Sequence, residues 1–375
     1  MQVLVTGGAG FIGSHTVDAL VARGHRVRVL DSLEPPVHRG EWPAHLPPQV
    51  ERRRGSVTDR DALLAALRDV DAVFHLAAYQ DYLPDFSRFF LVNSAGTALL
   101  YELIVAERLP VRAVVVASSQ AVYGEGCYRC PVDGPVYPGQ RDEAQLARRA
   151  WEARCPRCQG PAGPQWTDER VVGPHSPYGM SKRDQEEVAL KLGRRYGIPS
   201  VAFRYSIVQG PRQSFRNLYS GALRSFVVAA LQRQPPLLFE DGLQLRDYVS
   251  IHDVVRANLL ALEDPRLQYQ AFNVGSGRQV SVRELAALVF EEAGLGCEPE
   301  VPGLYRVGDT RHVFSDVGRL RALGWEPRVG QREIVREYLR WAAEQPELAE
   351  SFAEARRRMQ ALGVLRAAGG RESAA

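Results

Sequence analysis

The feature that most constrains this chain is a glycine cluster, residues 7–13, that lies between an apolar run and a helical pattern. Residues 2–6 are typical of a buried strand, and residues 11–23 carry apolar side chains at helical spacing. Glycines at such a turn let an anion approach the free N–H groups of the helix N-terminus. Asp31 ends the next predicted strand, where a ribose-binding carboxylate is expected. The pattern predicts a dinucleotide site, and because a carboxylate repels a 2′-phosphate it favours NAD over NADP.

Strands and helices alternate through the first half of the chain, which predicts an α/β fold with a doubly wound parallel sheet of the Rossmann kind. The predicted strands are 2–6, 26–31, 72–76, 112–117 and 200–205, and the predicted helices are 11–23, 59–67, 86–108 and 178–196. We expect an NAD-binding domain over 1–205 with a cysteine-rich insertion at 125–166. A smaller substrate domain over 206–343 and a C-terminal helix with a flexible tail over 344–375 complete the expected organisation.

The charge balance excludes a nucleic-acid surface. The 47 basic and 44 acidic residues leave a net charge of +3, whereas nucleic-acid binders concentrate positive charge. The first residues lack the basic and small-residue features of a signal peptide, and we identify no apolar run near the ~18 residues that a membrane span needs. We therefore expect no membrane partner and a cytoplasmic location, where thiols stay reduced.

Lysine is rare in this chain, and its placement indicates chemistry. Of the 47 basic residues, only Lys182 and Lys191 are lysine. Lys182 follows Tyr178 at a spacing that puts both on one helix face. A nearby ammonium lowers the pKa of a phenol and can hydrogen-bond a ribose, so the pair predicts a general base and its partner. Ser118, Ser119 and Gln120 follow a predicted strand, where open α/β sheets bind ligands.

Together these residues resemble the extended short-chain dehydrogenase/reductases, specifically the nucleotide-sugar epimerases and dehydratases. The resemblance runs from residue 2 to about residue 342. Its motifs are 7–13, 75–78, Asn93 with 96–97, 118–119 with 122–124, Tyr178 with Lys182, 203–205, 246–249, 273–277 and 308–312.

The resemblance implies roles for individual residues. Tyr178 would be the general base, Lys182 its partner and ribose ligand, and Ser119 a hydrogen-bond partner of the sugar hydroxyl. The implied cofactor-binding residues are Gly7, Gly10, Phe11, Ile12, Gly13, Asp31, Ser56, Val57, Leu76, Ala77, Ala78, Asn93, Ser118, Tyr178, Lys182 and Tyr205. The implied substrate-binding residues are Ser119, Gln120, Tyr178, Ile207, Arg246 and Arg311, with the two arginines assigned to a sugar diphosphate.

Departures from the family pattern reduce the number of reactions that the chain is expected to catalyse. Ser56 replaces a carboxylate that often meets adenine, and Ile207 replaces a common substrate-binding Asn. Dehydratases and decarboxylases of the family usually carry an acid after the catalytic hydroxyl, whereas this chain has Gln120 and Ala121. The resemblance therefore implies 4-epimerisation through a transient 4-keto sugar, with a dehydratase or reductase as alternatives. An NAD-binding sensor or scaffold without turnover is the non-enzyme alternative.

Four of the five cysteines form two pairs, Cys127 with Cys130 and Cys155 with Cys158. Two such pairs in a loop-rich segment predict a structural zinc site with four thiolate ligands. Unligated or oxidised thiols are the alternative, and Cys297 is expected to be an inert thiol.

Within the family, the cysteine pairs and the stretches 210–214, 216–221 and 239–244 are most similar to dTDP-L-rhamnose 4-epimerases, with UDP-glucose 4-epimerases as the runner-up. The resemblance also implies a homodimer that pairs helices 86–107 and 178–196. The apolar residues suited to that contact are Ala95, Leu99, Leu103, Val188 and Leu192, although an internal role is open for them.

Overall fold

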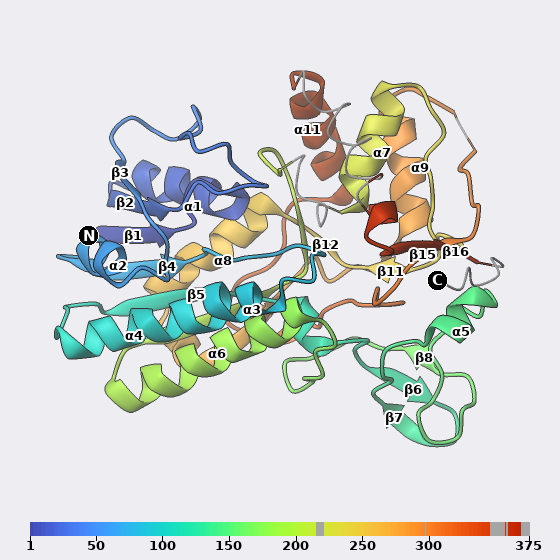
Figure 1. The fold of residues 1–375 in the computed structure, drawn as a ribbon, viewed down its shortest axis with the longest axis horizontal. Helices are drawn as coiled ribbons and strands as arrows, with labels where there is room; N and C mark the ends of the chain where they lie inside the picture. The colour runs from blue at the N-terminus through green and yellow to red at the C-terminus, as the bar shows by residue number, and fades with distance from the viewer. Residues whose placement is uncertain (215–220, 297, 346–356, 358, 369–375) are drawn as a thin grey trace.

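A parallel sheet of seven strands forms the centre of the molecule, with the order β13-β9-β5-β4-β1-β2-β3. The computed structural model describes residues 1–214, 221–296, 298–345, 357 and 359–368. The strands are β1 (Gln2–Thr6), β2 (Arg26–Asp31), β3 (Glu51–Arg54), β4 (Ala72–His75), β5 (Ala113–Ser119), β9 (Ser200–Tyr205) and β13 (Gln270–Val274). Figure 1 shows this sheet with helices on both sides.

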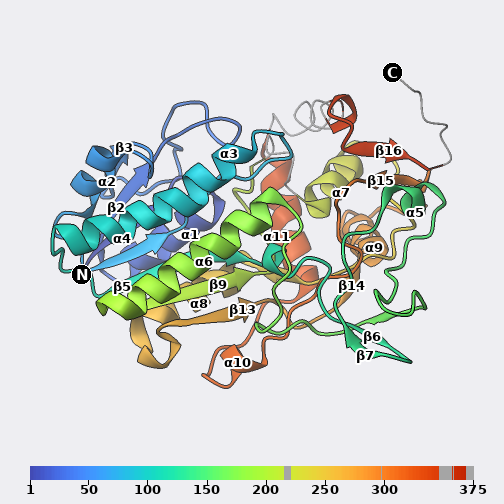
Figure 2. The same cartoon turned by 60° about the horizontal axis from the view of Figure 1, so that its bottom comes forward.

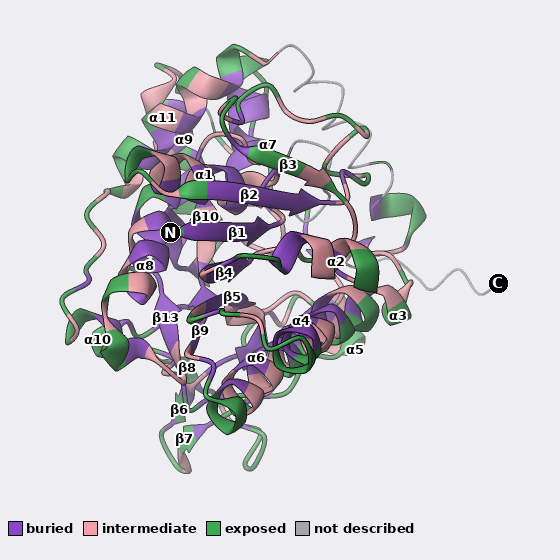
Figure 3. Ribbon diagram, turned by 90° about the vertical axis from the view of Figure 1, so that its left-hand side faces the viewer, coloured by how far each residue is buried: buried purple, intermediate pink, exposed green. Residues whose placement is uncertain are grey.

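Burial on both faces explains why the central strands are runs of apolar residues. All of β1 is buried, and its alternate side chains enter different cores: Val3 and Val5 join one, Leu4 the other. The first core is covered by α1 (Phe11–Ala22) and α8 (Ile251–Glu263). The second is covered by α2 (Arg60–Leu67), α4 (Gly96–Ala106) and α6 (Pro177–Tyr196). Figure 3 shows the buried strands between these helices.

The predicted α/β fold is confirmed, and every predicted strand and helix of the first half has a counterpart. The two edge strands were not predicted from periodicity. β3 is Glu-Arg-Arg-Arg and mostly exposed, so it carries no apolar signal. β13 is reached only after a long excursion of the chain and pairs with β9.

The second domain has its own core, formed mainly by α7 (Ala222–Leu231), α9 (Val282–Glu292) and α11 (Gln331–Ala343). Its short strands are β10 (Ile207–Gln209), β11 (Leu245–Arg246), β12 (Tyr248–Ser250), β14 (Val280–Ser281) and β15 (Leu304–Arg306). The short helices η3 (Pro265–Leu267) and α10 (Gly318–Arg321) pack on the first domain, because Leu267 and Leu320 belong to its core. The expected boundary at 205/206 is not a clean cut, because α8 and β13 return to the first domain.

The expected insertion projects from the first domain as a small three-stranded unit, visible beside the second domain in Figure 1. It contains β6 (Tyr128–Cys130), β7 (Gly134–Val136), α5 (Glu143–Ala147) and β8 (Gly163–Pro164), and it follows a 3₁₀ turn, Gln120–Tyr123. Its buried Arg141 is bonded to Glu240 at 2.9 and 3.0 Å, and its Glu152 is bonded to Arg311. Ion pairs therefore join the insertion to the second domain.

Part of the C-terminal region is structured. The strand β16 (Leu365–Ala367) pairs antiparallel with β15 (Figure 2), and the sequence predicted no strand in this region, only a helix followed by a flexible tail. Cys297 and most of the remaining tail lie outside the described residues.

Among the described residues, the helix Phe86–Ala106 is long and apolar enough to cross a membrane by length and composition, contrary to the expectation that no such run exists. It comprises α3 (Phe86–Phe89), a π-helical turn (Phe90–Ala95) and α4. It packs along α6, and its Leu100 and Leu103 are buried in the sheet's second core. The packing of this helix against α6 and the second core therefore explains its apolar side chains.

A buried ion pair fixes α6 to β9. Arg204 and Glu186 are almost inaccessible and joined by two hydrogen bonds of 2.7 and 2.9 Å. Arg204→Met leaves the Glu186 carboxylate with the Ser118 hydroxyl and the partly exposed Arg183 as its remaining partners, and should lower the free energy of unfolding by about 3 kcal/mol in urea titrations. Arg23→Met, which removes an exposed pair with Glu263, should cost less than about 1 kcal/mol. Equal losses in the two variants would contradict this explanation.

Candidate active site

One cavity of about 1240 Å³ collects most of the predicted site residues. It lies at the carboxyl ends of the sheet strands and extends to the second domain, which is where open α/β sheets bind ligands. The predicted residues that line it are Gly7, Gly10, Phe11, Ile12, Gly13, Asp31, Ser56, Val57, Leu76, Ala77, Ala78, Ser118, Ser119, Gln120, Tyr178, Lys182, Tyr205, Ile207 and Arg246. Asn93 and Arg311 do not line it, so the structure separates two predicted residues from the rest.

The glycine turn is packed so closely against backbone atoms that two of its positions have no space for a side chain. Gly7 has φ +70°, and a Cβ on it would lie 2.6 Å from the Ala77 nitrogen. A Cβ on Gly13 would lie 2.1 Å from the Gly7 oxygen, so α1 can pack this closely on the turn only with glycine. Gly10 caps α1 without a side-chain hydrogen bond, and the first turn carries no acidic residue. The helix N-terminus is therefore suited to a phosphate group.

Asp31 supports this turn from the end of β2. Its carboxylate accepts hydrogen bonds from the backbone N–H groups of Ala9 and Leu33, both at 3.0 Å. The side chain is nearly buried yet lines the cavity. An acidic group at this point suits ribose hydroxyls and disfavours a 2′-phosphate.

Tyr178 and Ser119 are brought together by the start of α6. Ser176 caps the helix by accepting a hydrogen bond from the Gly179 N–H at 3.0 Å, and Pro177 occupies its first turn. Gly179 passes so close to the loop after β5 that a Cβ would lie 2.5 Å from the Ala121 oxygen. This approach places the Tyr178 hydroxyl in hydrogen-bond contact with Ser119.

Burial dominates the ionisation of this pair. It raises the pKa of Tyr178 to about 12, and the hydrogen bond from Ser119 opposes that rise. Burial also lowers the pKa of Lys182 to about 7. The predicted lowering of the phenol pKa by Lys182 is therefore not seen: burial dominates, and the ammonium nitrogen is 5.8 Å from the phenol ring centre.

Lys182 is held by partners that the sequence did not reveal. Its ammonium donates to the Ala117 carbonyl and to Gln185 Oε1, both at 2.7 Å. Gln185 in turn donates to Thr97 Oγ1 at 3.0 Å, and Thr97 contacts the fully buried His75 at 3.0 Å. These bonds fix the lysine head group where it meets the cavity.

Asn93 holds two segments of the site together by hydrogen bonds. Its side chain accepts from the Tyr79 N–H at 2.8 Å and donates to the Tyr79 carbonyl at 3.0 Å and to Ser181 Oγ at 2.9 Å. It lies in the π-helical turn Phe90–Ala95, a distortion often found at functional sites. Asn93 thus joins the chain after β4 to α6, and it positions the site without lining the cavity.

Arginines line the second-domain wall of the cavity. Arg246 is held by the carbonyls of Leu245, Thr310 and Arg311 and by the Asp309 carboxylate at 3.3 Å, and it lines the cavity. Arg224 and Arg306 also line the cavity and were not predicted. Burial lowers the pKa of Arg224 to about 10, with the charge of Arg306 acting in the same direction. Arg224 could have been found as the single charged residue of the apolar segment 222–231. This wall suits an anion with several oxygens.

Arg311 has a different place from the one predicted. Its guanidinium is fully buried and bonded to Glu152 at 2.6 and 3.0 Å, Glu240 at 2.9 Å and Asp241 at 2.7 and 2.8 Å. Its donors are consumed by these carboxylates, and it lies apart from the cavity. Arg311 therefore holds the loop that supports Arg246, and we no longer assign it to substrate.

The remaining wall comes from segments that carried no motif. Asp81, Tyr82 and His175 line the cavity with polar side chains, and Met359 and Val364 line it from the C-terminal region. Tyr82 lies at the arginine wall, where its hydroxyl accepts from Arg306 at 3.4 Å. Ile207 is also a wall residue, so an apolar contact replaces the amide that the family pattern often has.

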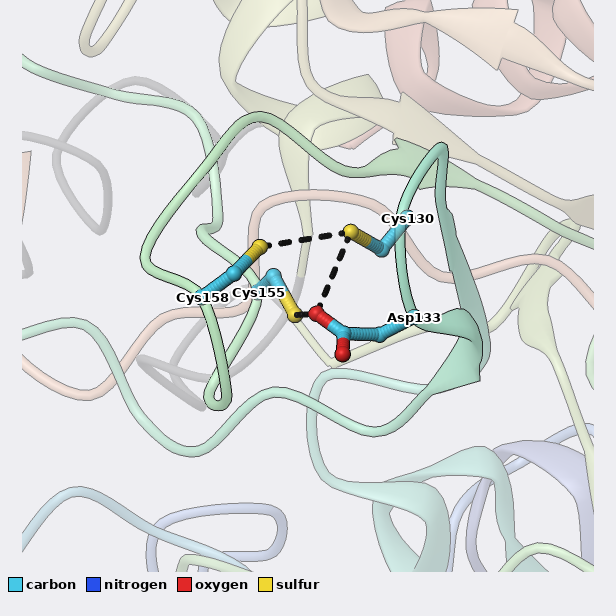
Figure 4. Close-up of side chains that lie close together, drawn as sticks. All are labelled: Cys130, Asp133, Cys155 and Cys158. Atoms are coloured by element: carbon cyan, nitrogen blue, oxygen red, sulfur yellow. Dashed lines mark hydrogen bonds between the residues drawn. The ribbon is translucent and has the colours of Figure 1, made fainter.

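The cysteines do not form the predicted set. Cys130, Cys155 and Cys158 converge with Asp133 (Figure 4), whereas Cys127 lies apart. Cys127 precedes β6 and packs beside Val122 and Val171. Because side chains alternate along a strand, Cys127 and Cys130 point to opposite faces. The structure therefore does not bring the four predicted cysteine ligands together, and the prediction that Cys127 belongs to the set is wrong.

The fold and the cavity define an α/β protein of the Rossmann type with a serine, a tyrosine and a lysine together on one cavity wall. The family model of the NAD dependent epimerase/dehydratase family matches residues 3–143 and 153–275. The chain therefore belongs to the NAD-dependent epimerase/dehydratase family, which confirms the predicted family and its class of enzyme.

Individual relatives and solved structures agree with that membership. A dTDP-L-rhamnose 4-epimerase of Burkholderia thailandensis is 35% identical over 92% of this chain and 95% of its own length. A putative UDP-glucose 4-epimerase of Methanocaldococcus jannaschii is 30% identical over 91% of this chain and 98% of its own. The structure is similar to a Thermus thermophilus UDP-glucose 4-epimerase in complex with NAD, with a TM-score of 0.70, 31% identity, and 91% and 98% coverage of the two chains.

The buried lysine should not tolerate arginine. Lys182 is enclosed with two acceptors, and a guanidinium is larger and brings five donors. Lys182→Arg should weaken dinucleotide binding by about tenfold or more, equivalent to about 1.4 kcal/mol or more, in fluorescence titrations with NADH. Lys191→Arg is the matched control, because Lys191 is exposed and pairs only with the Glu187 carboxylate among its described salt bridges. Equal binding by both variants would contradict this role of Lys182.

Proposed function

We propose that the protein is an NAD-dependent nucleotide-sugar 4-epimerase that works through a transient 4-keto sugar. The observation that carries the proposal is one continuous cavity with three parts. It has a glycine turn and Asp31 at one end, Ser119, Tyr178 and Lys182 in the middle, and arginines at the other end. A molecule with a diphosphate at the arginines can present its sugar to Tyr178 beside a dinucleotide.

The residues at the first end suit NAD. Gly7, Gly10 and Gly13 line the cavity at the N-terminus of α1, where a pyrophosphate is stabilised. Asp31 faces the expected ribose, and Ser56, Val57, Leu76 and Tyr205 are further members of the cavity wall. Bound NAD⁺ supplies an acceptor for the sugar's C4 hydride and a positive charge that favours the ionised phenol.

The chain's own residues then handle the proton. Tyr178 takes the proton of the C4 hydroxyl and returns it after the keto sugar has turned in the cavity. Ser119 stabilises the phenolate through its hydrogen bond, which already opposes the rise in the pKa of Tyr178. Lys182, fixed by Ala117 and Gln185, is placed to hold a ribose hydroxyl and to add positive charge near the phenol.

Epimerisation is favoured over elimination by the two residues after Ser119. Gln120 and Ala121 line the cavity at the positions where the family's dehydratases usually have acids, and neither side chain can donate or take a proton as an acid–base catalyst. A 4-keto sugar formed here is therefore expected to be reduced again rather than dehydrated.

For the substrate we propose dTDP-L-rhamnose, supported by the 35% identity to the Burkholderia enzyme of that name. UDP-glucose is the second candidate, supported by the Methanocaldococcus and Thermus relatives. Purified protein loaded with NAD should be offered the two sugars separately and the products separated by chromatography. NAD bound with epimer formed from neither sugar would contradict both candidates and favour another substrate or an NAD-binding scaffold.

We further propose a homodimer and a cytoplasmic location. The helix Phe86–Ala106 and α6 expose large apolar side chains, including Phe86, Leu91 and Met180. Ala95, Leu99, Val188 and Leu192 are at least partly exposed on the same helices, whereas Leu103 belongs to the core. Three of the cysteines converge with Asp133 in an arrangement suited to a metal ion, and such use of cysteine is typical of a reducing compartment.

Removing only the base should separate binding from turnover. Tyr178→Phe keeps the ring but loses the hydroxyl, so kcat should fall by about 10²–10⁴ or more while bound NAD is retained. Turnover and the NAD content of the same preparation are the measurements. Wild-type kcat in this variant would remove Tyr178 from the mechanism.

The arginine wall should control binding rather than chemistry. Arg246→Gln removes a charged donor from the proposed diphosphate contact, so KM should rise by about ten- to hundredfold with kcat nearly unchanged, in line with a charged hydrogen bond of about 1.5–3 kcal/mol. Arg266→Gln is the control, since Arg266 is exposed and pairs with Asp264. A fall in kcat without a change in KM would contradict this assignment.

A further inference from the structure

Two short turns of the insertion share one local design although they are far apart in the sequence. Each begins with a cysteine and a proline and carries a second possible ligand three residues after the cysteine: Cys130 with Asp133, and Cys155 with Cys158. The residue after each second ligand has a left-handed backbone, with φ +72° at Gly134 and +59° at Gln159. Such turns resemble the knuckles that present two ligands to one metal ion.

Backbone hydrogen bonds shape both turns. The Val132 N–H donates to Cys130 Sγ at 3.4 Å. In the other turn, the Gln159 N–H donates to the Cys155 carbonyl at 3.0 Å, and the Cys155 N–H donates to the Gly160 carbonyl at 2.9 Å. The turns are thus fixed by their own backbone, and their ligand atoms are directed to a common point (Figure 4).

The spacing of the four ligand atoms fits a small tetrahedral ion. All lie within 4.8 Å of one another. Cys130 Sγ is 3.5 Å from Cys158 Sγ and 3.6 Å from Asp133 Oδ2, and Cys155 Sγ is 3.1 Å from the same oxygen. Zinc bonds of about 2.3 Å to sulfur and about 2.0 Å to oxygen require ligand separations of about 3.5–3.8 Å. A disulfide needs about 2.05 Å, so the pair 130/158 is not bridged.

The insertion lacks the means to hold this arrangement by packing alone. Its buried cluster consists of Tyr128, Cys130, Val136, Ala153, Cys155 and Ala162, so two of the six members are themselves possible ligands. Its strands have two or three residues each. A core of this size does not offset the entropy of ordering such loops, and a metal ion is a common substitute.

We propose that Cys130, Asp133, Cys155 and Cys158 bind one structural Zn²⁺ ion, with the Asp133 carboxylate as the fourth ligand in place of Cys127. Thiolates select zinc over the hard cations Mg²⁺ and Ca²⁺, and four protein ligands leave no open position for catalysis. The exposed Cys158 offers a path for the ion. This metal site does not depend on the proposed epimerase activity.

The ion would act on the catalytic cavity from a distance. Two residues of the insertion that follow the first turn in the sequence reach the cavity region. Gln140 lines the cavity, and Arg141 donates to the Asp309 carbonyl at 2.9 Å and to Glu240. The loop from Asp309 to Arg311 holds the guanidinium of Arg246. An ordered insertion therefore supports the arginine wall, and loss of the ion should raise KM more than it changes kcat.

The decisive experiment compares Asp133 with Cys127. Full-length protein made in zinc-supplemented medium is analysed for metal by mass spectrometry. We expect about one zinc per chain in the wild type and in Cys127→Ser, and less than about a fifth of that in Cys155→Ser and Asp133→Ala. Asp133→His, which restores a zinc ligand, should keep the ion and guards against loss by misfolding.

Chelator competition adds a second readout, because a carboxylate is a weaker zinc ligand than a thiolate. Asp133→Cys should retain zinc at chelator concentrations that strip the wild type, and Cys127→Ser should release it like the wild type. Zinc near zero in the wild type would overturn the proposal. So would loss of zinc from Cys127→Ser with retention in Asp133→Ala, because that result would restore the four-cysteine set.

Discussion

The site depends on one costly placement, the ammonium of Lys182 inside the protein at the end of β5. Burial penalises the charged form and lowers its pKa to about 7, and the Ala117 carbonyl and Gln185 are the groups that offset the penalty. The same burial raises the pKa of Tyr178. Lys182 is therefore held close to a change of protonation state, whereas Tyr178 stays protonated until a positive charge nearby favours its phenolate.

The surrounding fold can be understood as support for that placement. Gly179 allows α6 to begin against the loop after β5, Asn93 fastens α6 to the chain after β4, and the pair of Arg204 with Glu186 fastens it to β9. Farther out, the carboxylates around Arg141 and Arg311 join the insertion to the second domain. The arginine wall of the cavity is thus built from three separate parts of the chain, around Arg224, Arg246 and Arg306.

The range of the interactions decides how much of the site the sequence could predict. The glycine turn and the spacing of Tyr178 and Lys182 are local, so the residues alone predicted them. Gln185, Thr97 and Arg224 carry no local motif, and their contacts with the site come from the packing of distant segments. Local patterns also misled: the pair of Cys127 and Cys130 has the spacing of a metal motif, yet the strand after Cys127 turns its side chain away and Asp133 takes the position.

In the proposed reaction, the hydride taken from C4 of the nucleotide sugar is the one that is returned to C4, while sugar and cofactor stay in one cavity. The direct measurement uses substrate carrying deuterium at C4 and follows the epimer by mass spectrometry and NMR. We predict that the epimer keeps the deuterium at C4, because the cofactor and the keto sugar stay in the cavity between the two steps. Epimer whose deuterium has been replaced by hydrogen from solvent would contradict the claim.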